Sequence, residues 1–436
     1  MAKIFIEEST LSAIGNSIRA KTGKANMISP LNMPTEIESI QTSGGSSTVT
    51  TGDVSFYDYN GTLVASYSLS EAQALTALPD GPTHEGLTFQ GWNYTLEKVK
   101  AFTRSMNVGA TYTTNDGKTR IYITLGEGRT SPLLGCCPNG TVIVDWGDGT
   151  TPDTLTGTST STIQYTPTHN YTSPGNYVIS LTVDGTCGFL GNNTYNNFCC
   201  LLKYSTTADT RNLYYQNAIT KIELGDNVTS IGHDTFRGCY SLTSLTIPNS
   251  VTSIEVSAFN SCYSLTSLTI PDSVISIGNS VFSGCYSLTS LTIPDSVTNI
   301  GSYIFSSCYS LTSLTIPDSV TNIKSYIFSG CYSLTSLTIP DSVTNIVDGA
   351  FQNCYSLTSI VIPDSVTTIG QNAFYSCYGM AEYHLKPTTP PALSNTNAFN
   401  DIPSDCIIYV PQGSLEAYQT ATNWATYASH MQEETT

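Results

Sequence analysis

Apolar positions recur every 23 residues between Phe236 and Tyr378, where seven near-copies of one unit follow each other. In the copy CYSLTSLTIPDSVTNI (residues 285–300), Ser, Thr and Asp separate the apolar residues, which are Leu288, Leu291, Ile293, Val297 and Ile300. The alternation of Leu291 and Ile293 predicts a short strand with one face inward, and the Pro-Asp-Ser that follows predicts a turn. A fixed period of this length predicts a solenoid, in which each coil buries its apolar face against its neighbours.

One phenylalanine and one cysteine mark each unit. The phenylalanines are Phe236, Phe259, Phe282, Phe305, Phe328, Phe351 and Phe374, and the cysteines are Cys239, Cys262, Cys285, Cys308, Cys331, Cys354 and Cys377. Although the chain has 13 cysteines, we interpret this column as small buried apolar residues rather than as a disulfide framework. Coils about 4.8 Å apart would permit only strained bridges. Seven cysteines also cannot all pair with one another.

A tyrosine follows each repeat cysteine. These tyrosines are Tyr240, Tyr263, Tyr286, Tyr309, Tyr332, Tyr355 and Tyr378. Stacked on successive coils, their rings would fall within range of offset aromatic contacts. Two interpretations stay open. The column is either an aromatic track on which sugar rings or a protein partner lie, or a self-stacking ladder that stiffens the coil.

The repeat pattern AF..C..L..L.IP..V..I resembles the BspA-type leucine-rich repeat. The tail Cys406–Trp424 (CIIYVPQGSLEAYQTATNW) is similar to the cap that often closes such arrays. The resemblance implies a binding surface rather than a catalytic site, because these repeats occur on adhesins and surface proteins. We therefore divide this part of the chain into a solenoid (204–378) and a C-terminal cap (379–436).

The copies differ mainly in the residues just before the cysteine, as in GHDTFRG (232–238), GSYIFSS (301–307) and KSYIFSG (324–330). Variation confined to one edge indicates that this edge has no single packing requirement, so it faces either solvent or a ligand. Loops on rigid scaffolds commonly carry binding residues. We therefore hypothesise a recognition edge, whose members are His233, Arg237, Tyr303, Lys324 and Tyr326.

Acidic residues form a second column, made of Asp272, Asp295, Asp318, Asp341 and Asp364, with Asn249 in the first unit. Unit charges about 5 Å apart in water repel by only about 0.8 kcal/mol, so turn chemistry explains the column, with calcium between coils as the alternative. Asp145, Asp148 and Asp153 carry the same two interpretations. Cys136, Cys137, Cys187, Cys199 and Cys200 lack CxxC spacing and give little sign of zinc. We expect no metal and no cofactor.

Residues 1–48 are predicted to form a small helical unit with a Gly/Ser linker. Ser9 can cap a helix with an apolar stripe, and a second short helix can start at Pro34. The opening ESTLSAIGNSIRAKTGKANMISPLNMPTEIESI resembles the N-terminal module of tail-associated proteins from phages of Gram-positive gut bacteria. This resemblance implies that residues 1–41 attach the chain to other virion proteins.

Residues 49–118 are predicted to form a small α+β module that acts as a spacer. Two strands flank the turn at Asn60-Gly61, Ser70 caps a short helix, a second helix covers 95–104, and Asp116-Gly117 closes a hairpin. The segment LPDGPTHEGLTFQGWN (78–93) resembles the Listeria-Bacteroides repeat, which implies a β-grasp-like fold.

Residues 119–203 are predicted to form a β-sandwich, because turn signals separate several short strands. The segments VIVDWGDGT (142–150), HNY (169–171) and GNYVISLTV (175–183) resemble a PKD domain, an immunoglobulin-like module. The resemblance implies display or binding. It also implies that Trp146 packs the core and that Asp148-Gly149 closes a hairpin.

Charge and motifs exclude several classes of function. The net charge is −17 with only 11% charged residues, which argues against nucleic acid and offers no polybasic segment to a membrane. No apolar run is long enough to span a bilayer, and the first ten residues lack the features of a secretory signal. The five histidines lie scattered, and no nucleophile, phosphate-loop or dinucleotide motif appears. We therefore expect a protein made in a cytosol that is not an enzyme.

Together these patterns predict a mainly β, multi-domain protein with a helical anchor, a β-grasp-like module, a PKD-like sandwich and a capped leucine-rich-repeat solenoid. We expect a homo-oligomeric phage protein on the virion surface, in a tail fibre or tail tip. Its repeats would bind a host cell-surface glycan or protein through many weak contacts. The alternatives are a bacterial cell-surface BspA-like adhesin and a capsid-decorating protein.

Overall fold

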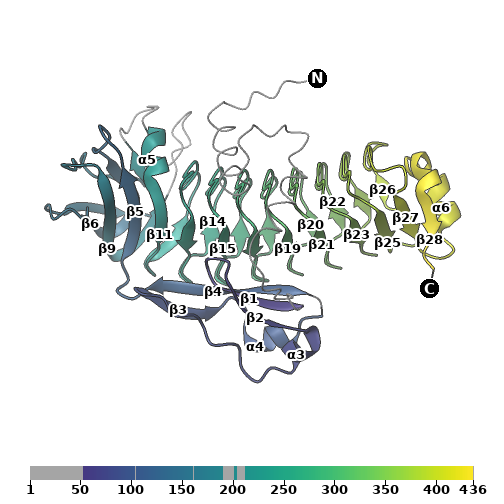
Figure 1. Cartoon of the computed structure of the whole chain (residues 1–436), viewed down its shortest axis with the longest axis horizontal. Helices are drawn as coiled ribbons and strands as arrows, with labels where there is room; N and C mark the ends of the chain where they lie inside the picture. Colours follow the sequence, from purple (N-terminus) through teal and green to yellow (C-terminus); the bar gives the residue numbers. More distant parts are fainter. Residues whose placement is uncertain (1–52, 104, 161, 190–200, 204–211, 436) are drawn as a thin grey trace, which may run out of the picture. The chain divides into compact units, whose positions relative to one another are not determined.

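The computed structural model describes residues 53–103, 105–160, 162–189, 201–203 and 212–435, all within one compact unit that spans Thr51–Thr436. The predictions for residues 1–48 and for Cys199 and Cys200 therefore lie outside the described residues. Figure 1 shows the order of the elements along the chain. In the described ranges, every helix is too short or too polar to cross a lipid bilayer.

The repeat region is a solenoid whose coils each contribute two short strands, as the 23-residue period predicts (Figure 1). The sheet row comprises β11 (Ile219–Glu223), β13 (Ser244–Thr246), β15 (Ser267–Thr269), β17 (Ser290–Thr292), β19 (Ser313–Thr315), β21 (Ser336–Thr338), β23 (Ser359–Ile362), β25 (Glu382–Leu385), β27 (Ile407–Val410) and β28 (Met431–Glu433). The opposite row comprises β12 (Val228–Ile231), β14 (Ser253–Ile254), β16 (Ser276–Ile277), β18 (Asn299–Ile300), β20 (Asn322–Ile323), β22 (Asn345–Ile346), β24 (Thr368–Ile369) and β26 (Ala392–Leu393). Paired strands in both rows run parallel, one repeat apart, so Leu268 pairs with Leu291 and Ile277 with Ile300.

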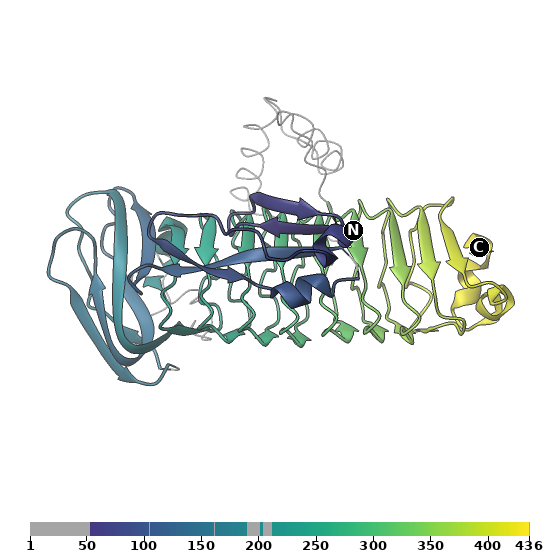
Figure 2. The same cartoon turned by 90° about the horizontal axis from the view of Figure 1, so that it is seen from below.

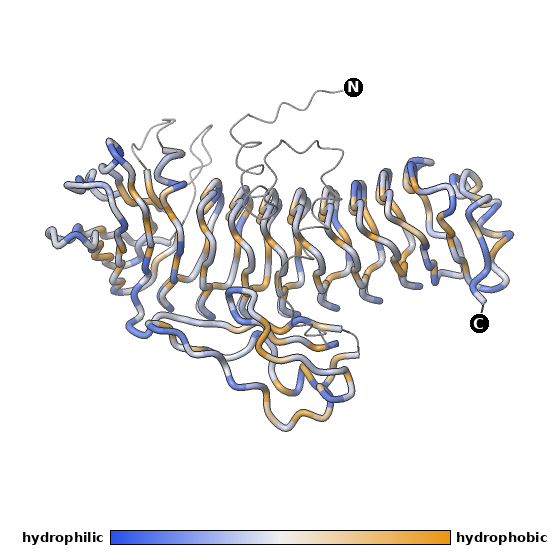
Figure 3. The backbone as a smooth tube through the Cα atoms, viewed as in Figure 1, coloured by the Kyte–Doolittle hydropathy of each residue, from blue (hydrophilic) through white to orange (hydrophobic). Residues whose placement is uncertain are grey.

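Figure 3 shows apolar and polar residues alternating along each of the successive coils. The buried side chains of neighbouring coils are equivalent. Phenylalanine rings from Phe236 to Phe374 stack with centroids 5.1–5.8 Å apart, and Leu, Ile and Val side chains from both rows surround them. The column continues past the last repeat, because Phe399 stacks on Phe374 at 5.1 Å. The solenoid thus extends beyond Tyr378 into the segment that we assigned to the cap.

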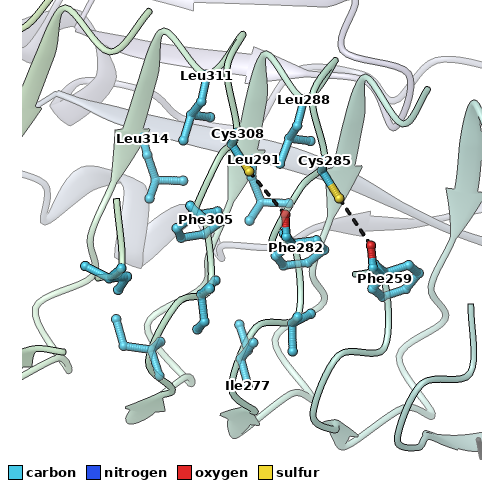
Figure 4. Close-up of a cluster of buried hydrophobic side chains, with 14 of the residues drawn as sticks. Phe259, Ile277, Phe282, Cys285, Leu288, Leu291, Phe305, Cys308, Leu311 and Leu314 are labelled. Atoms are coloured by element: carbon cyan, nitrogen blue, oxygen red, sulfur yellow. Dashed lines mark hydrogen bonds between the residues drawn. The ribbon is translucent and has the colours of Figure 1, made fainter. Parts of the chain in front are cut away.

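The repeat cysteines are free and buried, as we interpreted them, but they are not only apolar filling. Each thiol from Cys262 to Cys377 donates a hydrogen bond to the phenylalanine carbonyl of the preceding coil, at 3.2–3.3 Å. Figure 4 shows two of these bonds, from Cys285 to Phe259 and from Cys308 to Phe282. The thiols therefore link successive coils.

The serine of each Pro-Asp-Ser or Pro-Asn-Ser turn makes a second link between coils. From Ser250 to Ser365, its hydroxyl donates to the valine carbonyl of the preceding coil at 2.6–2.9 Å. Ser296, for example, donates to Val274. The serine predicted to stabilise the turn therefore bonds to the neighbouring coil and not within its own turn.

A β-sheet region precedes the solenoid and is continuous with it. Its elements are β5 (Thr119–Leu125), β6 (Leu133–Asp145), β7 (Asp153–Thr158), β8 (Gln164–Tyr165), β9 (Gly175–Phe189) and β10 (Leu202–Lys203), followed by α5 (Asn212–Ala218). Strand β9 pairs with β5 and β6 and also with β12, while β5 pairs with β11. Trp146 is buried and β6 pairs with β7 across Asp148-Gly149, as predicted. This sheet therefore covers the N-terminal end of the solenoid.

The α+β module consists of β1 (Val54–Tyr57), β2 (Leu63–Tyr67), α3 (Leu69–Gln73), β3 (Leu87–Trp92), α4 (Leu96–Lys100) and β4 (Met106–Thr114), with strand order β2-β1-β4-β3. Helix α3 is capped by Ser68 rather than Ser70, because Ser68 forms a capping box with Glu71. The predicted hairpin at Asp116-Gly117 is wrong. Strand β4 pairs with β1 and β3, whereas β5 pairs with β9 and β11, so this turn leads from one sheet to another.

The module packs against the repeats instead of acting as a spacer (Figure 2). Strand β4 crosses β13, β15, β17 and β19. The Tyr94 hydroxyl donates to the Ile293 carbonyl at 3.0 Å within the buried contact. Ser267 donates to the Tyr59 carbonyl at 3.0 Å, and Lys98 pairs with Asp295 at 2.8 Å near the rim. This contact covers the outward side chains of the first coils of the sheet row.

The C-terminal end of the solenoid is closed by α6 (Leu415–Thr420) and the 3-10 helix η2 (Trp424–His430). The Trp424 indole donates to the Pro391 carbonyl, and the Tyr418 hydroxyl donates to the Pro387 carbonyl, both at 2.7 Å. Because both side chains are buried, they cover the last coil with apolar surface without leaving a polar group unpaired. This agrees with the cap that the tail sequence implies.

We expect Cys308→Ala to lower the free energy of unfolding by about 1–2 kcal/mol, because it removes a hydrogen bond between coils and leaves a small cavity. The Phe282 carbonyl would keep its bond from the Cys285 amide. Urea unfolding measures the change, with exposed Thr298→Ala as the control that stays within about 0.5 kcal/mol. Equal stability of both variants would show that the thiol bond contributes nothing.

Stability should also fall at alkaline pH. Burial raises the pKa of the Cys285 and Cys377 thiols to about 12, whereas an unfolded thiol ionises near pH 8.5. Their contribution is therefore complete below about pH 8.5 and is lost as the pH rises towards 12. Each such thiol should add a slope of about −1.4 kcal/mol per pH unit in this window. Urea unfolding between pH 7.5 and 10.5 tests this. Cys285→Ala should make the fall in unfolding free energy with pH less steep by the contribution of one thiol.

The docking of the module should depend on Tyr94 more than on Lys98. Tyr94→Phe removes a buried hydrogen bond, which we expect to weaken docking by about 1 kcal/mol. Lys98 is 53% exposed, so Lys98→Ala should change docking by less than about 1 kcal/mol, and less again in high salt. Hydrogen exchange in peptides that contain β4 or β17 reports the opening. Faster exchange in the Lys98 variant alone would reverse this order.

Candidate binding surfaces

The tyrosine column forms a continuous stack along one edge of the coils. From Tyr240 to Tyr378, neighbouring ring centroids lie 4.4–5.4 Å apart with interplanar angles of 4–25°. The stacking that the sequence predicts is therefore confirmed. Burial raises the pKa of Tyr309 and Tyr355, so their hydroxyls stay protonated above the usual range.

The stack limits what the tyrosines can bind. Each internal ring has another tyrosine ring on both faces, so a sugar ring has no aromatic face to lie on there. These rings expose only their edges and hydroxyl groups to solvent. Tyr378, at the end of the stack, is 57% exposed and has one face covered by Tyr355. Binding along the column by hydroxyl groups stays a prediction.

The variable edge has an unusual backbone. Each coil has a left-handed residue at two positions, and the residues at the first of these are Asp234, Ser257, Ser280, Tyr303, Tyr326, Gly349 and Asn372. Small or polar residues tolerate this conformation best, whereas a bulky L residue loses about 1–2 kcal/mol there. Tyr303 and Tyr326, with φ of 60° and 53°, are the two bulky exceptions.

These two tyrosines form a pair. Their rings are parallel within 11°, with centroids 5.0 Å apart, and Tyr303 is 43% exposed. Gly349 makes room for the pair, because a Cβ atom there would lie 2.3 Å from the Tyr326 ring. The sequence comparison of the repeats therefore brought together two residues that do contact each other.

The other members of the hypothesised recognition edge do not join this pair. His233 and Arg237 belong to the first repeat, three coils or about 14 Å before Tyr303. Arg237 pairs with Asp234 of its own coil at 3.2 Å. Lys324 is half-buried on the same coil as Tyr326. The five residues thus lie along one edge, but they form no single cluster.

The outward face of the sheet row changes along the solenoid. Under the module, Ser267, Thr269 and Thr292 are 5–7% exposed, whereas Ser336 and Thr338 of β21 are exposed. The equivalent positions in the next coils carry Val361, His384 and Tyr409, which pair across three strands. Val361 is 47% exposed, and the His384 and Tyr409 rings stack at 5.0 Å.

Charged groups surround His384. Its Nδ1 lies 3.2 Å from Glu434 and its Nε2 lies 3.3 Å from Glu382. Lys386 pairs with the same Glu434 at 2.7 Å and lowers the pKa of that carboxyl. Sequence reasoning missed this surface because its residues come from three coils with irregular spacing. The end of the regular repeat motif after Cys377 was the available signal.

Four of the acidic residues considered for calcium make protein contacts. Asp145 accepts from the Gly147 amide, Asp148 from Thr150 and His169, and Asp153 from the Trp146 indole. Asp295 pairs with Lys98 of the module. In the part of the chain that the structure describes, no three His, Cys, Asp or Glu residues gather as a metal site.

Comparison with known proteins identifies the repeats. The family model described as the BspA type leucine rich repeat region matches six copies over residues 209–333, 252–381 and 298–407. Curated protein sequences gave no match.

Three solved structures are similar to parts of the chain. A leucine-rich repeat protein of T. pallidum is 36% identical, with a TM-score of 0.32, over 32% of this chain and 66% of that one. A leucine-rich repeat protein from Bacteroides ovatus is 25% identical, with a TM-score of 0.39, over 49% of this chain and 59% of that one. A leucine rich cell surface protein from Faecalibacterium prausnitzii is 27% identical, with a TM-score of 0.34, over 46% and 62%. The chain thus spans less than two thirds of each. Residues 209–407 are thus similar to BspA-type leucine-rich repeats.

Proposed function

We propose that this is a non-catalytic surface protein that binds cells through its repeat array. The observation that carries the proposal is the contrast between its coil junctions and its turn edge. The same stacks and hydrogen bonds recur at successive junctions, whereas the exposed side chains change along one edge. A rigid scaffold with one variable edge suits recognition better than chemistry.

We propose further that the protein is carried on a phage virion, in a tail fibre, tail tip or capsid decoration. The support is the resemblance of residues 1–41 to the attachment module of phage tail-associated proteins. Residues 209–407 support a bacterial cell-surface adhesin equally well, because BspA-type repeats suit that role too. In both cases many copies of a weak site would give firm attachment.

Mass spectrometry separates the two carriers. On the virion proposal, the chain should be found in purified phage particles and be missing from walls of uninfected bacteria. Recovery from walls of phage-free cells, with none in particles, would support the adhesin instead. A capsid location would appear as chain bound to tailless heads.

Binding of the labelled full-length chain to a panel of Gram-positive gut bacteria tests the adhesive function. We expect binding to selected strains and none after heat unfolding. Two substitutions examine the other surfaces: Tyr378→Ala at the end of the tyrosine stack and Tyr409→Ala on the sheet face. If the turn edge carries recognition, both variants bind like the wild type. A full-length chain that binds no strain and no particle would contradict the proposal.

A further inference from the structure

The Tyr303–Tyr326 pair offers one aromatic face to a ligand. Tyr326 lies against the backbone at Gly349 and stacks on Tyr303. Because the two rings are parallel, the second face of Tyr303 turns towards the preceding coil, which has Ser280 at this position. A serine side chain is too short to cover a phenol ring. The open face therefore lies in a step between two coils.

Hydrogen-bonding groups without charge border this step. The Asn279 side-chain oxygen accepts the Ser302 amide at 2.9 Å. This approach needs Gly301, because a Cβ atom there would lie 2.6 Å from the same oxygen. With its oxygen held, the exposed Asn279 carboxamide presents N–H donors beside the step. The Ser280 hydroxyl, which can donate and accept, belongs to the preceding coil at the side of this step.

Folding alone does not favour tyrosine here, because a single ring stack has to offset the strain of two left-handed tyrosines. Neighbouring coils place serine, aspartate, glycine or asparagine at this left-handed position, and each of these is easier to accommodate. Backbone strain of this kind concentrates at functional sites, where a ligand contact selects the strained residue. The strained position and the open ring face thus point to the same site by separate observations.

We propose that Tyr303 is the floor of a saccharide-binding site, with Asn279 and Ser280 at its side. A pyranose ring has one face of C–H groups, which packs on an aromatic face, and a rim of hydroxyls, which needs uncharged donors and acceptors. The step supplies both. This inference rests on the proposed adhesive function and adds the class of ligand, a cell-surface carbohydrate rather than a protein.

The test uses full-length protein and wall polysaccharide purified from the bacterial panel, measured by calorimetry. Tyr303→Ser installs the residue of the preceding coil. We expect it to weaken binding about tenfold or more while the midpoint of thermal unfolding stays equal or rises. Tyr303→Phe keeps the ring and should keep the affinity. Tyr378→Ser removes a tyrosine outside the site that is more exposed than Tyr303, 57% against 43%, and is the control.

Treating the cells identifies the class of partner. Periodate, which cleaves sugar diols, should abolish binding, whereas protease treatment of the cells should leave it intact. Wild-type affinity in Tyr303→Ser would overturn the site, and binding that protease but not periodate abolishes would overturn the ligand class. Cell binding without polysaccharide binding would overturn this inference alone. A chain that binds no cells at all would overturn the proposed function with it.

Should Tyr303→Ser fold poorly, Tyr303→Asn, which copies Asn372 at the equivalent position, gives the same comparison. Loss of binding in both variants, with the unfolding midpoint of the wild type or above, supports the site. Loss of binding together with a lower midpoint in both would instead assign Tyr303 a structural role.

Discussion

The carbonyl oxygen of the repeat phenylalanine accepts two hydrogen bonds, and the solenoid depends on this junction. One bond comes from the cysteine amide of its own coil and the other from the cysteine thiol of the next coil. The phenylalanine amide donates to the next coil, and its ring stacks on the next ring. A coil contacts only its neighbours, so each end needs a cover. Strands β5 and β9 supply one, and Trp424 and Tyr418 supply the other.

Much of this arrangement could be predicted from the sequence, because every repeat has apolar and aromatic residues at the same positions. The period gave the coils, the phenylalanine and tyrosine stacks, and the buried cysteines. The thiol bond could not be predicted, since its acceptor lies 26 residues away on a carbonyl that any residue would provide. The docking of the module could not be predicted either. Tyr94 and Ile293, which form its buried hydrogen bond, are 199 residues apart, and no sequence motif links them. The helix N-cap at Ser68 could have been predicted from the sequence, because Glu71 three residues later completes a capping box.

The candidate site could likewise be predicted only in part. Comparing the repeats singled out Tyr303 and Tyr326, which do pair, yet it also selected His233 and Arg237, which lie about three coils away. The sequence left open whether the stacked tyrosine faces could also bind a ligand, and the structure shows that internal faces are covered by neighbouring rings. The sequence also does not show that the module covers the first coils. Both facts direct attention to the turn edge. A site of one ring and two polar groups is weak by itself, which agrees with a function that relies on many copies.

The near-identity of the coils has a consequence for how such a chain changes over generations. Because the coils are almost identical in amino-acid sequence, a deletion or duplication of whole 23-residue units would remake the same phenylalanine junction at the new seam. Array length can therefore drift with little cost in stability. The coils under the module are the exception, because Tyr94 and Lys98 bind particular members of the row. Lineages should thus differ in the number of coils beyond β19 and keep those before it.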